Sequence, residues 1–275
     1  MYQTLIACSE LAAIIDDTDV IVVDCRFDLG APAAARAAWL EAHVPGAVYA
    51  HLDDDLSGPP TTDRGRHPLP PPATIAARCG RLGIGDGSQV VIYDDSHGMV
   101  AARLWWMLRY LGHRPVAVLD GGWQHWVASG LPVRAGAESH PPRALGATPQ
   151  VSRLVRIEAI DEAMCLLDAR DEARYRGECE PVDPHAGHIP GAYNHCWRNN
   201  LAEDGRFLPP AALRERLTRA LGRAPDESIT HYCGSGVSAC HNILAQYIAG
   251  GGEARLYAGS WSEWCRSPEH RGMMD

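Results

Sequence analysis

The sequence lacks any apolar run near the ~20 residues that a helix needs to cross a bilayer. Residues 1–5 carry no basic region ahead of a long apolar segment, so we expect no secretory signal. Basic side chains are also scarce: 25 Lys and Arg face 34 Asp and Glu, a net charge of −9. A chain this acidic is poorly suited to nucleic acid or an anionic membrane surface, and we expect neither as a partner.

The nine cysteines contain no Cys-x-x-Cys pair. This absence excludes the spacing of a zinc knuckle and of a thioredoxin-type redox motif, and we expect no metal site. The number of cysteines is odd and their spacing is scattered. With no secretory signal visible, they are best interpreted as free thiols in the reducing environment of the cytoplasm.

The chain of 275 residues repeats one plan in its two halves. The matched segments are residues 22–26 and 166–170, 43–47 and 188–192, and 120–123 and 258–261. A period this long indicates a duplicated domain rather than a solenoid. We expect one domain at residues 1–135, a Pro/Gly/Ala-rich linker at 136–152 and a second domain at 153–275.

Strands alternate with helices in each half. Strands are expected at residues 20–24, 89–93 and 116–119, and helices at 74–82 and 99–111. A polar stretch at 52–72 is expected to form a long loop, and such loops are often functional. The pattern predicts an α/β fold with two tandem domains, each a mainly parallel sheet flanked by helices. Ligands bind such sheets at the carboxyl ends of the strands.

Residues 229–240 indicate a strand, a tight glycine turn and a helix, with Cys233 at the end of the strand. Gly234 and Gly236 allow the backbone to fold around the sulfur. An apolar stripe at three-to-four spacing marks the helix that follows. A thiol at the N-terminal end of a helix is shifted towards the nucleophilic thiolate. The alternative is a buried cysteine with a packing role, against which the flanking glycines argue.

The repeat provides an internal comparison for this loop. Aligning the halves places Asp95 opposite Cys233, so the first half has the loop without the sulfur. If a thiolate carries the chemistry, only the C-terminal domain is catalytic.

Three segments together resemble the two-domain rhodanese-type sulfurtransferases, which comprise thiosulfate and 3-mercaptopyruvate sulfurtransferases. The segments are residues 188–191, 233–239 and 259–264, and the resemblance extends over nearly the whole chain. It implies that a donor delivers sulfane sulfur to Cys233 as a persulfide. A thiol such as thioredoxin or glutathione, or cyanide, then accepts the sulfur, and no metal or organic cofactor is needed.

The resemblance also implies how the anions are held. Backbone N–H groups of the loop would cradle the persulfide, which gives binding roles to Gly234, Gly236, Val237 and Ser238. Arg174 matches the family's substrate-binding arginine, because a guanidinium can hold a carboxylate or sulfonate-like group with two parallel hydrogen bonds. Arg176, two residues further on, is a second candidate.

Ser235 matches a serine that the mercaptopyruvate enzymes use with a histidine and an aspartate. His67 matches the histidine, and Asp55 is the expected aspartate, with Asp53 as its alternative. Such a trio would manage the proton of the donor thiol. The resemblance therefore favours 3-mercaptopyruvate as the donor, but one departure weakens the binding of its carboxylate and keeps thiosulfate as an alternative. Val182 stands where the mercaptopyruvate enzymes carry a second arginine, a loss for which Arg176 or His185 would have to compensate.

Two alternative functions are compatible with parts of this pattern. A cysteine phosphatase of the same fold needs His-Cys-x5-Arg, but here Tyr232 precedes Cys233 and Ala239 stands six residues after it. The loop therefore lacks the arginine that grips phosphate. The second reading is a non-catalytic sulfur-binding or protein-interaction module. Retention of Cys233, its glycines and Arg174 argues against it.

Overall fold

The computed structural model describes residues 1–61 and 63–271, which form two compact units. Unit 1 contains Met1–Leu56, Pro70–Gln150 and the short segment Asp204–Arg206. Unit 2 contains Ser57–Leu69, Val151–Glu203 and the described chain from Phe207 onward. The segment Ser57–Leu69 therefore packs with unit 2, although it belongs to the first repeat in sequence. The expected boundaries at residues 135 and 153 stay a prediction.

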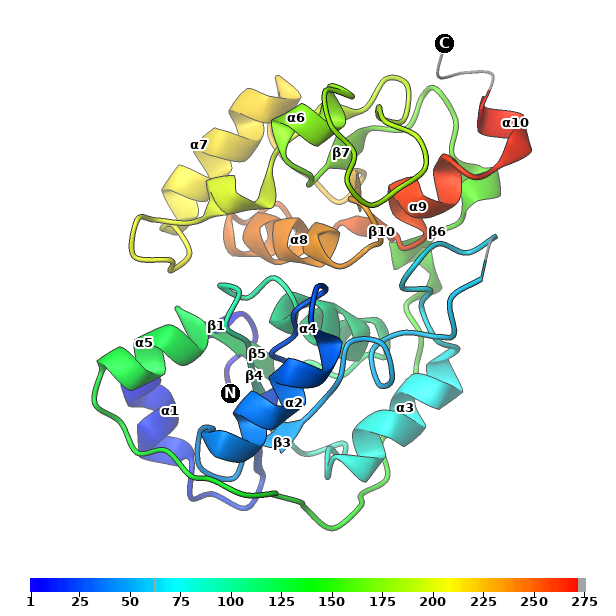
Figure 1. Cartoon of the computed structure of the whole chain (residues 1–275). Coiled ribbons are helices and arrows are strands. Elements are labelled where there is room, and N and C mark those ends of the chain that lie inside the picture. Colours follow the sequence, from blue (N-terminus) through cyan, green and yellow to red (C-terminus); the bar gives the residue numbers. More distant parts are fainter. Residues whose placement is uncertain (62, 272–275) are drawn as a thin grey trace. The chain divides into compact units, whose positions relative to one another are not determined.

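Unit 1 is built on a five-stranded sheet in the order β1-β5-β4-β2-β3, and every adjacent pair of strands is parallel (Figure 1). Its strands are β1 (Leu5–Ile6), β2 (Val20–Asp24), β3 (Val48–Tyr49), β4 (Gln89–Tyr93) and β5 (Val116–Leu119). Its helices are α1 (Cys8–Ile14), α2 (Pro32–Glu41), α3 (Pro72–Arg81), α4 (Ala101–Tyr110) and α5 (Gly122–Ala128).

Unit 2 repeats this sheet in the order β6-β10-β9-β7-β8, again with parallel pairs throughout. Its strands are β6 (Leu154–Val155), β7 (Leu166–Asp168), β8 (Tyr193–Asn194), β9 (Thr230–Tyr232) and β10 (Arg255–Tyr257). Its helices are α6 (Glu172–Tyr175), α7 (Pro210–Leu221), α8 (Ser238–Ile248), α9 (Ser260–Trp264) and α10 (Pro268–Arg271), with short 3-10 turns at Val151–Arg153, Ile157–Ala159 and Trp197–Asn200. The α/β fold with two mainly parallel sheets is confirmed.

Burial on both faces explains why β2, β4 and β7 are largely apolar, although β9 carries the buried polar residues Thr230 and His231. All residues of β2 and β4 are buried, and so are all those of β7 and β9. Parallel sheets covered by helices require such continuous apolar runs. The strands expected at 20–24, 89–93 and 116–119 are confirmed. Helix α3 begins at Pro72 rather than at residue 74, because proline is well tolerated in the first turn, where its missing N–H has no partner to lose.

The strand registers define which residues of the two units correspond. In unit 1, Tyr93 is the residue opposite Asp24, and in unit 2 Tyr232 is opposite Asp168. Each tyrosine is the last residue of its strand. The residue that follows each tyrosine therefore occupies the same place in the two sheets.

The residues that follow are Asp94 in unit 1 and Cys233 in unit 2. A second correspondence agrees: the N–H of Trp123 donates to the carbonyl of Asp94 at 2.9 Å, and that of Trp261 donates to Cys233 at 3.0 Å. The expectation that Asp95 stands opposite Cys233 is wrong by one residue. That expectation rested on aligning the two halves by sequence, whereas strand register fixes the match.

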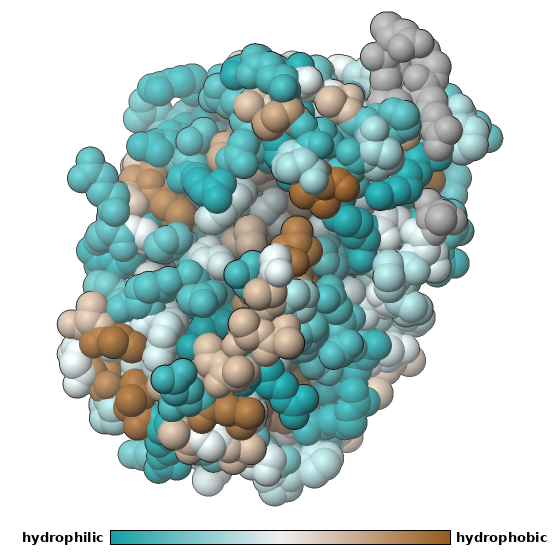
Figure 2. Space-filling model, viewed as in Figure 1, coloured by the Kyte–Doolittle hydropathy of each residue, from teal (hydrophilic) through white to brown (hydrophobic). Residues whose placement is uncertain are grey.

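Most large apolar side chains are inside the two units. On the face drawn in Figure 2, hydrophilic residues cover most of the surface and apolar residues form small groups. Large apolar side chains that are exposed include Met1, Leu29, Leu40, Val127, Val133, Val151, Val182 and Tyr193. Among the described helices, none is both long and apolar enough to cross a membrane.

Candidate active site

Cys233 lies in the loop between β9 and α8, at the carboxyl end of its strand, and is only 2% exposed. The N–H of Gly236 donates to its Sγ at 3.1 Å. Gly236 has a φ of 78°, and a β-carbon there would collide with the carbonyl oxygen of Ala258. Glycine is therefore required at this turn, and the turn is what aims an N–H at the sulfur.

The equivalent loop of unit 1 holds a negative charge from within the chain. The Asp94 carboxylate is fully buried and accepts hydrogen bonds from the N–H groups of Ser96 at 2.9 Å, Gly98 at 2.8 Å, Val100 at 2.7 Å and Ala101 at 2.8 Å. Burial raises the pKa of Asp94, while these donors act in the opposite direction. A loop of this shape thus directs several N–H groups at the side chain that follows the strand.

His67 and Ser235 meet beside the cysteine loop. His67 Nδ1 lies 2.7 Å from Ser235 Oγ, and each residue is 7% exposed. The segment that carries His67 is closed on itself and joined to the rest of unit 2. Within it, Gly58 donates its N–H to the carbonyl of Pro68 at 2.7 Å, and the N–H of Arg66 donates to the side-chain Oγ of Ser262 at 3.1 Å. The structure therefore brings together two of the three residues expected to form a proton relay.

Arg174, at the end of α6, reaches the same loop. A β-carbon built on Gly234 would lie 3.5 and 3.6 Å from its two terminal nitrogens. Glu180 holds the guanidinium, accepting hydrogen bonds from Arg174 Nη2 at 2.7 Å and Nε at 3.2 Å. Burial acts to raise the pKa of Glu180, but the hydrogen bonds and the charge of Arg174 outweigh it and lower that pKa. Arg174 is thus a fixed positive charge next to Gly234.

A second arginine, not expected from the sequence, lies still closer. A β-carbon on Gly234 would stand 2.9 Å from Arg66 Nη2. Arg66 Nη1 forms an ion pair with the buried carboxylate of Asp183. No family motif marks Arg66, and the only signal in the sequence is its place directly before His67.

Arg176 and Val182 have surface positions. Arg176 is exposed, and its guanidinium pairs with Glu178 at 2.7 Å and Glu172 at 3.1 Å. The atoms nearest to a β-carbon on Gly234 belong instead to Arg66 and Arg174. Val182 is 38% exposed. A substrate-binding role for Arg176 stays a prediction that these contacts do not favour.

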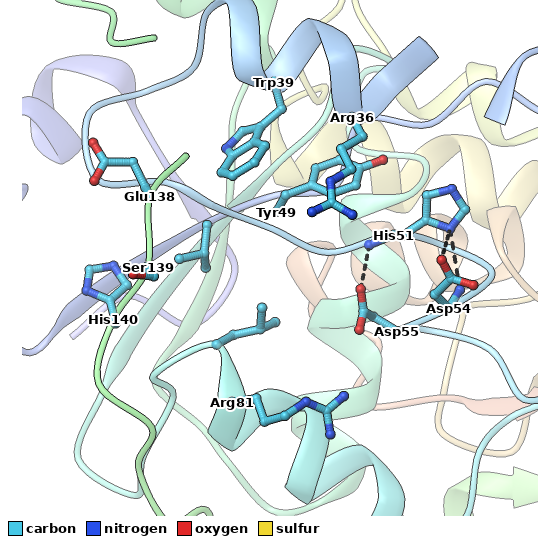
Figure 3. A pocket seen from close by; sticks show the side chains of 12 residues that line it. Arg36, Trp39, Tyr49, His51, Asp54, Asp55, Arg81, Glu138, Ser139 and His140 are labelled. Carbon is cyan, nitrogen blue, oxygen red and sulfur yellow. Dashed lines mark hydrogen bonds and ion pairs between the residues drawn. The ribbon is translucent and has the colours of Figure 1, made fainter. Parts of the chain in front are cut away.

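Asp55 lies in unit 1, where its carboxylate closes its own turn. It accepts the N–H of His51 at 2.9 Å, and the N–H of Asp55 donates to the carbonyl of His51 at 2.9 Å. Figure 3 shows Asp55 beside a cavity of about 330 Å³ into which Arg36 and Arg81 also project. The lining of this cavity also includes Trp39, Val48, Tyr49, His51, Asp54, Leu82, Glu138, Ser139 and His140. The catalytic role expected for Asp55 stays a prediction.

Within the described ranges, no three His, Cys, Asp or Glu side chains are grouped so that they could hold a metal ion.

Comparison with known proteins identifies the family. The model of the rhodanese-like domain matches residues 7–129 and 152–267. A protein of Pseudomonas aeruginosa named "Probable 3-mercaptopyruvate sulfurtransferase" is 45% identical, over 96% of this chain and 95% of its own. The "Putative thiosulfate sulfurtransferase SseB" of Mycobacterium tuberculosis is 41% identical over 97% of this chain and 95% of its own.

Solved structures agree with these relatives. The 3-mercaptopyruvate sulfurtransferase from Leishmania major matches with a TM-score of 0.87 and 31% identity, over 98% of this chain and 77% of that one. Both repeats match the domain model, and the curated relatives match along nearly their full length. The chain therefore belongs to the rhodanese family, as a sulfurtransferase with two tandem rhodanese-like domains.

Proposed function

We propose that Cys233 is the residue that carries the transferred sulfur and that 3-mercaptopyruvate is the preferred donor, with thiosulfate as the second. The observation that supports this choice of donor is the contact of 2.7 Å between His67 Nδ1 and Ser235 Oγ, two residues from Cys233. Such a pair is suited to moving a proton, and a thiol donor has a proton to move whereas thiosulfate does not.

With 3-mercaptopyruvate, the Cys233 thiolate attacks the donor sulfur and the carbon–sulfur bond breaks. The bonding electrons leave on carbon as the enolate of pyruvate. The proton of the donor thiol passes through Ser235 and His67 to that carbon, which gives pyruvate and a Cys233 persulfide anion. With thiosulfate, the same attack breaks the sulfur–sulfur bond and sulfite leaves with the electron pair, so no proton moves.

The loop around Cys233 supplies the anion stabilisation in both reactions. The N–H of Gly236 donates to the sulfur at 3.1 Å, and the N–H groups that converge on the buried carboxyl group of Asp94 in the equivalent loop of unit 1 support this role. We assign the cradle of the persulfide to the backbone of Gly234, Gly236, Val237 and Ser238. Arg174 binds the anionic end of the donor, since its guanidinium is fixed beside Gly234.

Two aspartates, Asp55 and Asp53, are candidates for the third member of the proton relay. Asp55 was expected in this role, but its carboxylate accepts the N–H of His51. Asp53 is the alternative, and substitution of each distinguishes them.

The acceptor in this proposal is a thiol such as thioredoxin or glutathione, or cyanide, because each can attack the outer sulfur of a persulfide and regenerate the thiolate. We also propose a cytoplasmic enzyme, since all nine cysteines are unpaired and a reducing compartment keeps them so. The two functional domains are proposed at residues 1–135 and 153–275, joined by 136–152.

Intact-mass measurement tests the proposal. The protein is incubated with 3-mercaptopyruvate or thiosulfate, desalted and weighed, and peptide mapping locates any added mass. We expect one extra sulfur atom on Cys233, removed again by a thiol or cyanide and absent in Cys233→Ser. If neither donor adds sulfur there, Cys233 is not the carrier, and a non-catalytic module becomes the better description.

A further inference from the structure

The departure at Val182 leaves the site without the second arginine expected of a mercaptopyruvate enzyme, and another cation occupies the neighbourhood of Cys233. We propose that Arg66 is a specificity-determining residue: together with Arg174 it binds the anionic group of the sulfur donor, a carboxylate or an oxidised-sulfur anion. This inference rests on the proposed function of Cys233.

The first support is position. Gly234 directly follows the nucleophile, and the nearest atoms to a β-carbon built on it are Arg66 Nη2 at 2.9 Å and Arg174 Nη2 and Nη1 at 3.5 and 3.6 Å. Two guanidinium groups from distant segments therefore lie against one glycine of the loop. An anion that brings its sulfur to Cys233 enters the field of both charges.

The second support is the way Arg66 is anchored. Its Nη1 is paired with Asp183, a carboxylate whose side chain has no exposed surface. In the part of the chain that the structure describes, Nη1 is the only guanidinium nitrogen of Arg66 with a hydrogen-bond acceptor, and Nε is buried without one. The ion pair with Asp183 fixes the orientation of the guanidinium plane of Arg66. The N–H donors of Nη2 then remain directed at the loop that follows Cys233.

The third support is the balance of charge. Asp183 is shared, since its Oδ1 also contacts Arg266 at 3.3 Å and its Oδ2 lies 3.6 Å from Arg174. Four arginines contact three carboxylates in this group of ion pairs: Arg66, Arg170, Arg174 and Arg266 on one side and Asp168, Asp183 and Glu180 on the other. This preponderance of guanidinium groups gives the site a physical reason to select anionic donors.

The sequence explains why this cation comes from an unexpected segment. The residue after Val182 is Asp183, which is buried and binds Arg66. The chain thus carries a carboxylate beside the position where the resemblance to mercaptopyruvate enzymes implies an arginine, and that carboxylate pairs with an arginine from Ser57–Leu69, a segment of the first repeat that packs in unit 2.

Two variants test the role in catalysis. Arg66→Gln removes the charge, and Arg66→Lys keeps it but loses the planar fork. We expect Arg66→Gln to raise KM for both donors about tenfold or more, with kcat reduced less than about threefold, because the arginine binds the part of the donor that does not react. Arg66→Lys should recover part of the loss, and KM for the acceptor should not change. The matched control is Arg64→Gln, an exposed arginine two residues away.

A second measurement separates this inference from the proposed function. Iodoacetate is an anion and iodoacetamide is neutral, but both alkylate the same thiolate. The rate of iodoacetate divided by the rate of iodoacetamide, measured at the Cys233 peptide, therefore reports the local positive potential. We expect Arg66→Gln to lower this ratio about three- to tenfold and Arg64→Gln to leave it unchanged. An unchanged ratio in folded Arg66→Gln, or unchanged KM for both donors, would overturn the role of Arg66. If wild type takes no sulfur from either donor, the proposed function fails while the alkylation ratio still decides about Arg66.

Discussion

Replacement of Ser235 by alanine tests the choice of donor most directly. The substitution removes one oxygen from the loop and leaves every backbone N–H in place. Ser235 Oγ lies 2.7 Å from His67 Nδ1, and both residues are 7% exposed, so no bulk water readily replaces the hydroxyl. His67 then loses the group through which it reaches the donor thiol.

The expected magnitude follows from the role of the pair. A positioned proton-transfer group contributes roughly 10²- to 10⁴-fold, so we expect kcat/KM for 3-mercaptopyruvate to fall at least about 100-fold, or about 2.7 kcal/mol in transition-state stabilisation. Thiosulfate has no thiol proton, so its kcat/KM should fall less than about threefold. The cost in folding stability is that of one hydrogen bond, about 1 kcal/mol, too little to unfold the protein.

The assay compares steady-state kcat/KM for the two donors with one acceptor, in wild type, Ser235→Ala and the control Ser152→Ala, an exposed serine of unit 2. Asp53→Asn and Asp55→Asn extend the comparison, and we expect the loss selective for 3-mercaptopyruvate in the variant that removes the aspartate of the relay. Equal losses with both donors in Ser235→Ala would refute the proton relay, because the serine would then serve the loop in general.

Two further predictions concern stability. Asp94→Asn places an amide NH₂ against N–H donors that now bind a carboxylate, so we expect unit 1 to lose about 3 kcal/mol or more, measured by urea denaturation, whereas exposed Asp28→Asn should change little. Unchanged stability would show that the carboxylate is not needed to hold the loop. Acid should destabilise unit 2, because burial lowers the pKa of His231 from 6.5 to about 4. The unfolded chain binds this proton first, so stability falls as the pH drops below 6.5, by about 2 kcal/mol down to about pH 5. The same loss in His231→Gln would exclude this histidine as the cause.

Local patterns in the sequence were enough to predict the fold and the loop that contains Cys233. Continuous apolar runs such as Val20–Asp24 predict strands buried on both faces, and the structure contains them. The glycines on either side of Ser235 indicate a turn around Cys233, and Gly236 adopts the positive φ that such a turn needs. These features depend on neighbouring residues, which is why sequence spacing is informative about them.

The sequence therefore determined two α/β domains, a cysteine in a glycine loop at the end of a strand, and Arg174, Ser235 and His67 as residues around it. Tertiary structure decided the rest. Strand register, which depends on pairing between distant segments, moved the counterpart of Cys233 from Asp95 to Asp94. Packing of Ser57–Leu69 in unit 2 brought Arg66 against Gly234, because a buried carboxylate at Asp183 requires a partner and the nearest guanidinium in space is far away in the chain.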